Sequence, residues 1–319
     1  RDDVADLCAA ALTLRAPSGM ASPFADSSRG SVLALFNAGI LAGSFDEAGN
    51  RLYKGGDTLR RSEICSILIH VPDYVKRTFV ILNNTLIPID YSLRPSPYDE
   101  SCFYTKNGRV YYDDGVTKAR YGIDVSYYQG DVDWKAVAAD GIEFVMIRSG
   151  YRGSSSGALI EDSKFRDYIT GASKAGLDVG VYFFSQAVTE DEAREEARYT
   201  AQLIGDTELE LPVFFDWERV SDSESRTYDL GGAELTDCAV AFCEETEALG
   251  FDAGVYVYSE TGYYGYTLLR LSDYTIWNSS IGNYPYFYYA HSMWQYSFKG
   301  AVDGIDHDCD MDMMFIKSK

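Results

Sequence analysis

From residue 121 onward, short apolar runs alternate with longer segments whose apolar residues recur at helical spacing. The β-favouring runs lie at residues 121–125, 143–147, 178–184, 211–215, 253–258, 274–277, 292–296 and 309–315. Helical spacing marks residues 134–139, 163–175, 190–204 and 233–249. Strands that alternate with helices indicate a parallel sheet with right-handed crossovers. We therefore predict an α/β fold, a TIM-like (β/α) barrel with irregular late strands and its chemistry at the carboxyl ends of the strands.

The residues ahead of the barrel follow a different pattern and predict a small α+β N-terminal domain. Short helices are expected at residues 32–38 and 62–69. Asn83-Asn84 and Asn107-Gly108 are turn signals between β-favouring runs. The expected domains are a helical module at 1–77, a β-hairpin-rich linker or subdomain at 78–118 and the barrel at 119–319.

Composition narrows the class of protein. The apolar content of 46% and the charged content of 24% are ordinary for a soluble globular chain, whereas 26 tyrosines are many. Aromatic-rich clefts suit sugars, because rings stack on C–H faces while Tyr hydroxyls bond the polar rim; β-strand filler is the alternative use of Tyr. The net charge of −21 argues against nucleic acid and anionic membranes as partners. No uninterrupted apolar run reaches about 18 residues, so no membrane span is expected.

Cysteine and histidine offer little for metal or triad chemistry. The six cysteines form no C-x-x-C pair and are expected to be buried free thiols, although disulfides remain possible. Only three histidines are present, so a histidine-based zinc site or a Ser–His triad has little material. We expect neither a metal nor a cofactor. Because the chain begins at Arg1 rather than Met, we expect that an N-terminal piece has been removed.

The segment Pro212-Val213-Phe214-Phe215-Asp216-Trp217-Glu218 places two carboxylates two residues apart at the end of an apolar run. Side chains alternate along a strand, so Asp216 and Glu218 share one face. Two acids that close, against aromatic walls, should titrate apart, one ionised and the other protonated. Glycosidases use such a pair as proton donor and charge stabiliser. The alternative is a strand end where both acids simply reach solvent.

Three further segments place carboxylates, aromatic rings or an amide at predicted strand ends. Gly122-Ile123-Asp124-Val125-Ser126 holds an acid inside an apolar strand, which is costly unless it faces a polar lumen. Met293-Trp294-Gln295-Tyr296 offers aromatics and an amide. Residues 306–313 carry Asp at every even position, and period two places Asp310 on the polar face, opposite the core-facing Cys309 and Met311. A calcium site in this acidic run is the alternative, but the Gly and Glu positions of a calcium loop are missing.

Taken in this order, Gly-Ile-Asp-Val-Ser, Asp-x-Glu, Trp-Gln-Tyr and the acidic last strand resemble the family 25 glycoside hydrolases, muramidases of the N,O-diacetylmuramidase type, over residues 121–315. The resemblance implies that Glu218 is the proton donor and that Asp216, Asp124 and Asp310 are the other active-site carboxylates. It further implies that a sugar groove is lined by Tyr182, Phe184, Tyr256, Tyr258, Trp277, Trp294 and Tyr296.

The chain also departs from that family's pattern. Phe183 stands where His often follows the strand Tyr, Asn278 follows Trp277 where small apolar residues are common, and Asp312 closes the last strand where Asn is frequent. None of these differences removes a carboxylate.

The N-terminal region resembles a degenerate S-layer homology module. The segments Ser22-Pro23-Phe24-Ala25-Asp26, Gly39-Ile40-Leu41-Ala42-Gly43 and Arg60-Arg61-Ser62-Glu63 follow that repeat's order, and Arg1-Asp2-Asp3-Val4 echoes Arg61-Ser62-Glu63-Ile64. A small helical spacer is the alternative.

Together the two resemblances imply an extracellular or wall-associated enzyme that cleaves the β-1,4 bond between N-acetylmuramic acid and N-acetylglucosamine in peptidoglycan. The first domain would bind a secondary wall polysaccharide. The alternative function is a wall-polysaccharide binding protein whose barrel has lost activity; four retained carboxylates argue against it, because buried acids are costly. We further expect all four carboxylates to line one cleft at the carboxyl ends of the strands.

Overall fold

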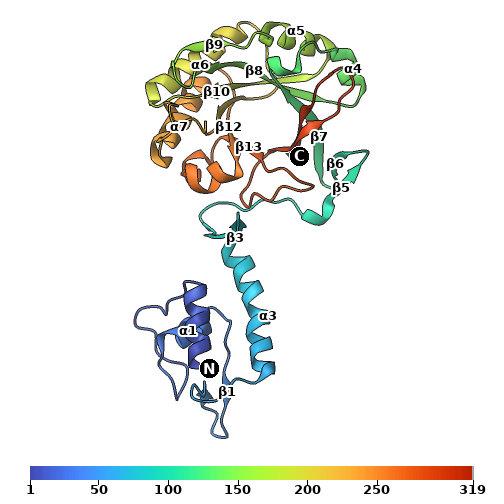
Figure 1. The fold of residues 1–319 in the computed structure, drawn as a ribbon. Helices are drawn as coiled ribbons and strands as arrows, with labels where there is room; N and C mark the ends of the chain where they lie inside the picture. Colours follow the sequence, from blue (N-terminus) through green and yellow to red (C-terminus); the bar gives the residue numbers. More distant parts are fainter. Residues whose placement is uncertain (318–319) are drawn as a thin grey trace. The chain divides into compact units, whose positions relative to one another are not determined.

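A computed structural model describes residues 1–317 and divides the chain into two compact units, Arg1–Asp90 and the remainder from Tyr91 onward (Figure 1). This division differs from the three expected segments. The hairpin at residues 79–88 belongs to the first unit, and residues 91–118 belong to the barrel unit. No helix in the described part of the chain combines the length and apolarity that a membrane crossing needs.

The first unit contains three helices and two small hairpins, and all three helices contribute to an apolar core. Its elements are α1 (Asp2–Ala11), α2 (Gly30–Asn37), β1 (Ser44–Phe45), β2 (Arg51–Leu52), α3 (Arg61–Thr78), β3 (Phe79–Leu82) and β4 (Thr85–Pro88). The fully buried Val32 and Leu35 of α2 lie at the centre of this core. Asn83 and Asn84 both have positive φ, 49° and 60°, as the tight turn of the β3–β4 hairpin requires, so this predicted turn is confirmed.

The second unit is built around a closed barrel of eight strands. In spatial order they are β7 (Thr117–Val125), β8 (Phe144–Arg152), β10 (Asp178–Ser185), β11 (Val213–Trp217), β12 (Ala253–Tyr258), β13 (Thr275–Ser279), β14 (Met293–Gly300) and β15 (Cys309–Lys317). Pairing of β15 with β7 closes the ring. Both pairings of β15, with β14 and with β7, are antiparallel, whereas the other ring pairings are parallel. The barrel is therefore mixed, and the regular all-parallel form of a TIM barrel is not what is found.

Helices cover only the first part of the barrel wall. They are α4 (Trp134–Ala139), α5 (Phe165–Ala175), α6 (Glu190–Ile204) and α7 (Gly232–Ala248), and the short β9 (Leu159–Glu161) pairs with β8 (Figure 1). All four lie within a residue or two of the predicted ranges. After β12 the described chain has only the short turns Thr261–Gly265 and Leu268–Leu271 before β13. The late strands therefore lack the helix that would normally bury their outer face.

A hairpin from the start of this unit covers that outer face instead. It consists of η1 (Glu100–Cys102), β5 (Phe103–Lys106) and β6 (Arg109–Tyr112), and its turn at Asn107 and Gly108 has positive φ as predicted. The Phe103 ring lies 5.4 Å from the Trp294 ring of β14, and Tyr98 stacks on Phe315 of β15 at 3.8 Å. These contacts explain why residues 91–118 fold with the barrel rather than as a separate linker.

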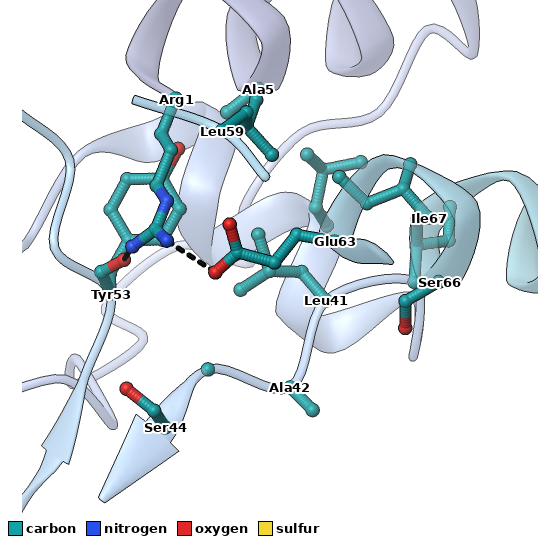
Figure 2. Close-up of a pocket in the computed structure, with 13 residues that line it drawn as sticks. Arg1, Ala5, Leu41, Ala42, Ser44, Tyr53, Leu59, Glu63, Ser66 and Ile67 are labelled. Atoms are coloured by element: carbon teal, nitrogen blue, oxygen red, sulfur yellow. Dashed lines mark hydrogen bonds and ion pairs between the residues drawn. The ribbon is translucent and has the colours of Figure 1, made fainter. Parts of the chain in front are cut away.

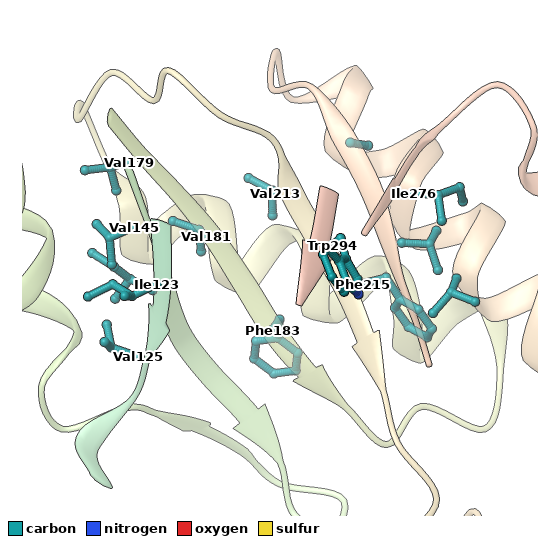
Figure 3. Packing of buried hydrophobic residues seen from close by; sticks show 14 of the residues in the cluster. Ile123, Val125, Val145, Val179, Val181, Phe183, Val213, Phe215, Ile276 and Trp294 are labelled. Atoms are coloured by element: carbon teal, nitrogen blue, oxygen red, sulfur yellow. The ribbon is translucent and has the colours of Figure 1, made fainter. Parts of the chain in front are cut away.

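Alternation along the strands separates two buried layers. The outer layer, between strands and helices, includes Val145, Val181, Val213 and Phe215 (Figure 3). The inner layer fills the barrel and consists of Phe144, Met146, Tyr182, Leu211, Phe214, Tyr256, Trp277, Met293 and Met314, with Tyr258 against it. Side chains at the same alternation positions as the inner layer, but nearer the rim, form the candidate site.

Candidate active site

Strand β11 places its two carboxylates on the inner face. Phe214 belongs to the inner layer and Phe215 and Trp217 to the outer one, so Asp216 points inward and Glu218 follows on the same side, as predicted. Asp216 is buried, at 4% exposure, whereas Glu218 is exposed just beyond the strand. Burial in this crowded environment still raises the pKa of Glu218.

Asp124 and Asp310 meet because the first and last strands are neighbours. They are direct partners in the antiparallel ladder between β7 and β15. Asp310 is the second residue of β15, and only because this strand runs opposite to β7 does its amino end reach the rim where β7 ends. The two carboxylates are therefore neighbours, but Asp310 does not come from the carboxyl end of its strand as expected.

Gln295 of β14 links these carboxylates to the neighbouring wall. Its Nε2 donates to Asp124 Oδ2 at 2.7 Å and to Asp310 Oδ2 at 3.4 Å, and its Oε1 accepts from the Tyr256 hydroxyl at 2.8 Å. The sequence prediction noted this amide without naming it as a site residue. The signal that could have identified Gln295 is its position between Trp294 and Tyr296, because alternation turns its side chain to the opposite face of the strand from theirs.

Asp312 is a fifth carboxylate that the predicted site omitted. It is fully buried, and its Oδ1 accepts from Trp277 Nε1 at 2.8 Å. Its side chain is also hydrogen-bonded with Asp124. Two carboxyl groups can form that bond only if one of them carries a proton. Asp at the even positions of the last strand was the signal, since Asp310 and Asp312 share one face.

Burial dominates the electrostatics of the cluster. It raises the pKa of Asp124 and of Asp216 well above the usual range, and nearby carboxylates add to the rise in both. Burial, followed by the charges of Asp124 and Glu218, raises the pKa of Asp310 to about 8. Burial also raises the pKa of Asp312 to about 8, although the hydrogen bonds from Trp277 and Asp124 oppose the rise. The site therefore holds several protons near neutral pH.

The raised pKa of Asp312 predicts a pH-dependent contribution to stability, which Asp312→Asn removes. Because Asp312 binds its proton more tightly when folded, the wild-type free energy of unfolding falls as pH rises between about 4 and 8. An amide still accepts from Trp277 and donates to Asp124 without titrating. We expect the variant to lose less stability between pH 5 and pH 8 by at least about 1.4 kcal/mol, equivalent to one pKa unit.

Denaturant unfolding at the two pH values measures this difference. Asp206→Asn, the same change at an exposed position, is the control and should follow the wild type. Parallel losses of stability in the wild type and Asp312→Asn would contradict the raised pKa of Asp312.

A cleft of about 780 Å³ opens beside Glu218. Glu218, Tyr256 and Tyr258 line it on the barrel side, and the segment around Gly231, the turn at Tyr264 and Phe298 form other walls. Asp124, Asp216 and Asp310 are not among its lining residues. Glu218 reaches this cleft, Asp310 is half-buried, and Asp124 and Asp216 are buried. The charge of Glu218 acts on the other three carboxylates, so the four lie near one another, and the expectation that all of them line one cleft stays a prediction.

The predicted sugar-binding aromatics fall into two groups. Tyr182, Phe184, Tyr256, Tyr258 and Trp277 occupy inner-face positions, with Phe184 and Tyr256 paired to Asp216 in the flanking ladders. Trp277 is 1% exposed and donates to Asp312, so it supports the carboxylates rather than offering a ring face.

Trp294 and Tyr296 are in the outer layer, under the β5–β6 hairpin, and Trp294 Nε1 donates to the Ser280 carbonyl. The prediction that these two residues line the groove is wrong. Gln295 between them is the residue of β14 that faces the site.

The acidic run at 306–312 is not arranged as a calcium site. Among residues 1–317, no group of three or more His, Cys, Asp or Glu side chains could hold a metal ion. Of the four aspartates in this run, only Asp310 and Asp312 lie in β15, where they turn inward. The six cysteines are all free thiols, and Cys238, Cys243 and Cys309 are buried.

Two known lysozymes are similar in sequence to part of this chain. The autolytic lysozyme of Clostridium acetobutylicum is 28% identical over 193 residues, 60% of this chain and 54% of the relative. Lysozyme M1 of Streptomyces globisporus is 25% identical over 205 residues, 61% of this chain and 67% of the relative. The chain thus spans about half the length of the first relative and two thirds of the second.

A similar fold is found in the modular autolysin LytC from Streptococcus pneumoniae, solved in complex with a synthetic peptidoglycan ligand. Its TM-score is 0.55 at 20% identity, over 75% of this chain and 58% of that one. The family profile "Glycosyl hydrolases family 25" matches residues 123–305, more than half of the sequence and nearly the whole barrel. The chain, through this barrel with its inward-facing carboxylates, therefore belongs to glycosyl hydrolase family 25.

Proposed function

We propose that the chain is a peptidoglycan muramidase that cleaves the β-1,4 bond between N-acetylmuramic acid and N-acetylglucosamine. Family membership, the two lysozyme relatives and the peptidoglycan-bound LytC support this substrate. The observation that carries the proposal is the pair on β11. An exposed acid with a raised pKa stands in an open cleft, two residues after a buried carboxylate whose Oδ1 has no hydrogen-bond partner among the described residues.

In this mechanism Glu218 is the general acid. Its proton passes to the glycosidic oxygen as the bond to the anomeric carbon breaks, so the leaving sugar departs as an alcohol. The ionised Asp216 stabilises the positive charge that develops at the anomeric centre, either directly or by accepting from the N–H of the 2-acetamido group while that group's oxygen attacks. Water then adds at the anomeric carbon and returns a proton to Glu218.

Asp124, Asp310 and Gln295 act behind this pair. Gln295 holds both aspartates and is itself held by Tyr256, whose strand neighbours β11. The cluster of acids disfavours further negative charge nearby, which helps Glu218 to keep its proton at neutral pH.

Product analysis on purified peptidoglycan tests the proposal. A muramidase creates new reducing ends on N-acetylmuramic acid, which borohydride converts to muramitol, whereas a glucosaminidase creates them on N-acetylglucosamine. Muramitol should accumulate with time. If the protein bound sacculi without producing new reducing ends, the alternative of an inactive wall-binding protein would be favoured.

We extend the proposal to the first unit as a wall-attachment module that resembles the S-layer homology repeat. The two helix starts that echo each other in sequence meet in space, because Arg1 next to α1 forms an ion pair with Glu63 in the first turn of α3 (Figure 2). Beside this pair lies a cavity of about 170 Å³ lined by apolar side chains such as Leu41, Leu59 and Ile67, with Ser44 and Ser66 among them. Apolar walls with a few hydroxyls suit a sugar.

Removal of residues 1–90 is expected to separate attachment from catalysis. The cut at Tyr91 leaves the β5–β6 hairpin on the barrel, so the shorter protein should keep its activity on soluble wall fragments. Its affinity for intact sacculi should fall about tenfold or more, as expected when one of two linked binding units is lost. Co-sedimentation with sacculi measures this, and equal binding of both proteins would favour a spacer role.

A further inference from the structure

Arg148 places a cation on the inner face of the barrel. Phe144 and Met146 of β8 belong to the inner layer, and Arg148 follows them at the same alternation. Its side chain is only 11% exposed. In the ladder it pairs with Tyr182 of β10, and β10 separates it from β11. Tyr182 pairs with Phe214 on its other side, and Asp216 lies two residues beyond Phe214. The Cα atoms of Arg148 and Asp216 are thus two strand spacings and two residues apart, roughly 12 Å, a gap that an arginine side chain crosses in part.

The guanidinium is held rigidly from the side away from β11. Its Nε donates to Asp162 Oδ2 at 2.9 Å, and Asp162 is itself almost completely buried. Its Cζ lies 5.1, 5.5 and 5.7 Å from the ring centroids of Tyr127, Tyr128 and Tyr151. Cation–π contacts and a charge-assisted bond leave this side chain little freedom, so its charge stays at a defined place.

Unused hydrogen-bonding groups remain on both Arg148 and Asp216. Arg148 Nη2 lies 2.8 Å from Asp162 Oδ2, but its N–H bonds are not directed at that oxygen, and it has no other hydrogen-bond partner among the described residues. Asp216 Oδ1 is buried and equally without a partner in this part of the chain. Asp216 thus has a buried acceptor that no hydrogen bond stabilises, and the cation on the same inner face is Arg148, held in its ion pair with Asp162.

Burial by itself would place the proton on the wrong carboxyl group. Desolvation favours the neutral form of both acids, but it acts more strongly on the buried Asp216 than on Glu218 at the rim. The proposed mechanism requires the reverse. Among the charges that act on Asp216, those of Glu218 and Asp124 raise its pKa and that of Arg148 lowers it.

We infer that Arg148 is a positioning residue that holds the negative charge on Asp216 and thereby leaves the proton on Glu218. The inference rests on the proposed function and adds to it the group that decides between the two carboxylates. Arg148 acts through Asp216 and has no contact with the reacting atoms in this assignment. The groups whose charge also bears on Asp216 are Glu218 of its own strand segment, Asp124 of β7, Tyr182 of β10, Tyr256 of β12 and Tyr266.

The test compares Arg148→Gln with Arg148→Lys. Both lose the planar contacts to Asp162 and the tyrosines, but only Gln loses the charge. Without the cation the pKa of Asp216 rises, so the acid limb of the pH–rate profile should move to higher pH by about one unit, with about a tenfold loss of kcat on that limb. Lys should keep the limb within a few tenths of a unit of the wild type. Arg120→Gln, which breaks an ion pair with Asp178 at the opposite end of the strands, is the control and should not move it.

A second measurement does not depend on activity. Carboxyl ¹³C resonances of labelled aspartate report titration directly, and the Asp216 signal is identified by its loss in Asp216→Asn. It should titrate about one unit higher in Arg148→Gln than in the wild type. Asp162→Asn removes the anion that offsets Arg148 and should shift the same signal to lower pH. An unchanged Asp216 titration in Arg148→Gln, or an equal shift in the Lys and Gln variants, would overturn the inference. Absence of hydrolysis by the wild type would instead overturn the proposed function.

Discussion

Glu218→Gln is expected to fold normally and to lose hydrolysis by about 10²–10⁴-fold, the usual contribution of a general acid. The amide has nearly the shape of the acid but cannot give a proton to the leaving oxygen. Glu218 is exposed just beyond β11, so an amide of nearly the same shape should change the stability little. The rate of release of new reducing ends from peptidoglycan measures the loss.

The matched control is Glu224→Gln. This residue is exposed in the segment between β11 and α7, and the change removes the same charge. It should hydrolyse at nearly the wild-type rate. If folded Glu218→Gln retained more than about a tenth of that rate, Glu218 would not be the acid, since the loss would fall below the usual range.

Asp216→Asn is expected to reduce turnover by about 10²–10³-fold with little effect on substrate binding. The charge that it removes matters most when the anomeric centre becomes positive, and electrostatic groups that act mainly in the transition state have effects of this size. Asp216 is buried and its Oδ1 has no hydrogen-bond partner among the described residues, so an amide of nearly the same shape should fit without a large loss of stability. Single-turnover kinetics and the binding of a non-hydrolysed glycan measure the two effects separately.

A loss confined to binding would contradict this role for Asp216. Asp310→Asn provides the comparison within the same cluster. Asp310 lies on β15, across the barrel from β11, and its side chain contacts Gln295. It influences Glu218 only through its charge, so Asp310→Asn should reduce kcat less than Asp216→Asn does.

Several features of the site could be predicted because they depend on neighbouring residues of one strand. A period of two places Asp216 with Glu218, and Asp310 with Asp312, whatever the strands beside them do. The helices α4 and α6 and the turns at Asn83–Asn84 and Asn107–Gly108 are equally local, since helical spacing and positive-φ residues are visible along the chain. The order of strands and helices was therefore enough to predict a barrel.

The alternation of side chains along a strand did not show which of its two faces points into the barrel. In an exposed sheet the polar face marks solvent, but both faces of a barrel strand are buried, so period two separates two sets of side chains without orienting them. The family resemblance implied that Trp294 and Tyr296 line the groove, and alternation could not correct this, although Gln295 between them is the residue that reaches Asp124.

The sequence by itself thus determined the order of the elements, the carboxylate pair of β11 and the shared face of the last-strand aspartates. Only the tertiary structure decided that β15 runs antiparallel, which brings Asp310 to Asp124, and that the β5–β6 hairpin replaces a helix over β14. It also placed Arg148 across β10 from Asp216. These features join residues far apart in the chain, and strand direction, register and burial depend on all neighbours at once rather than on any local pattern.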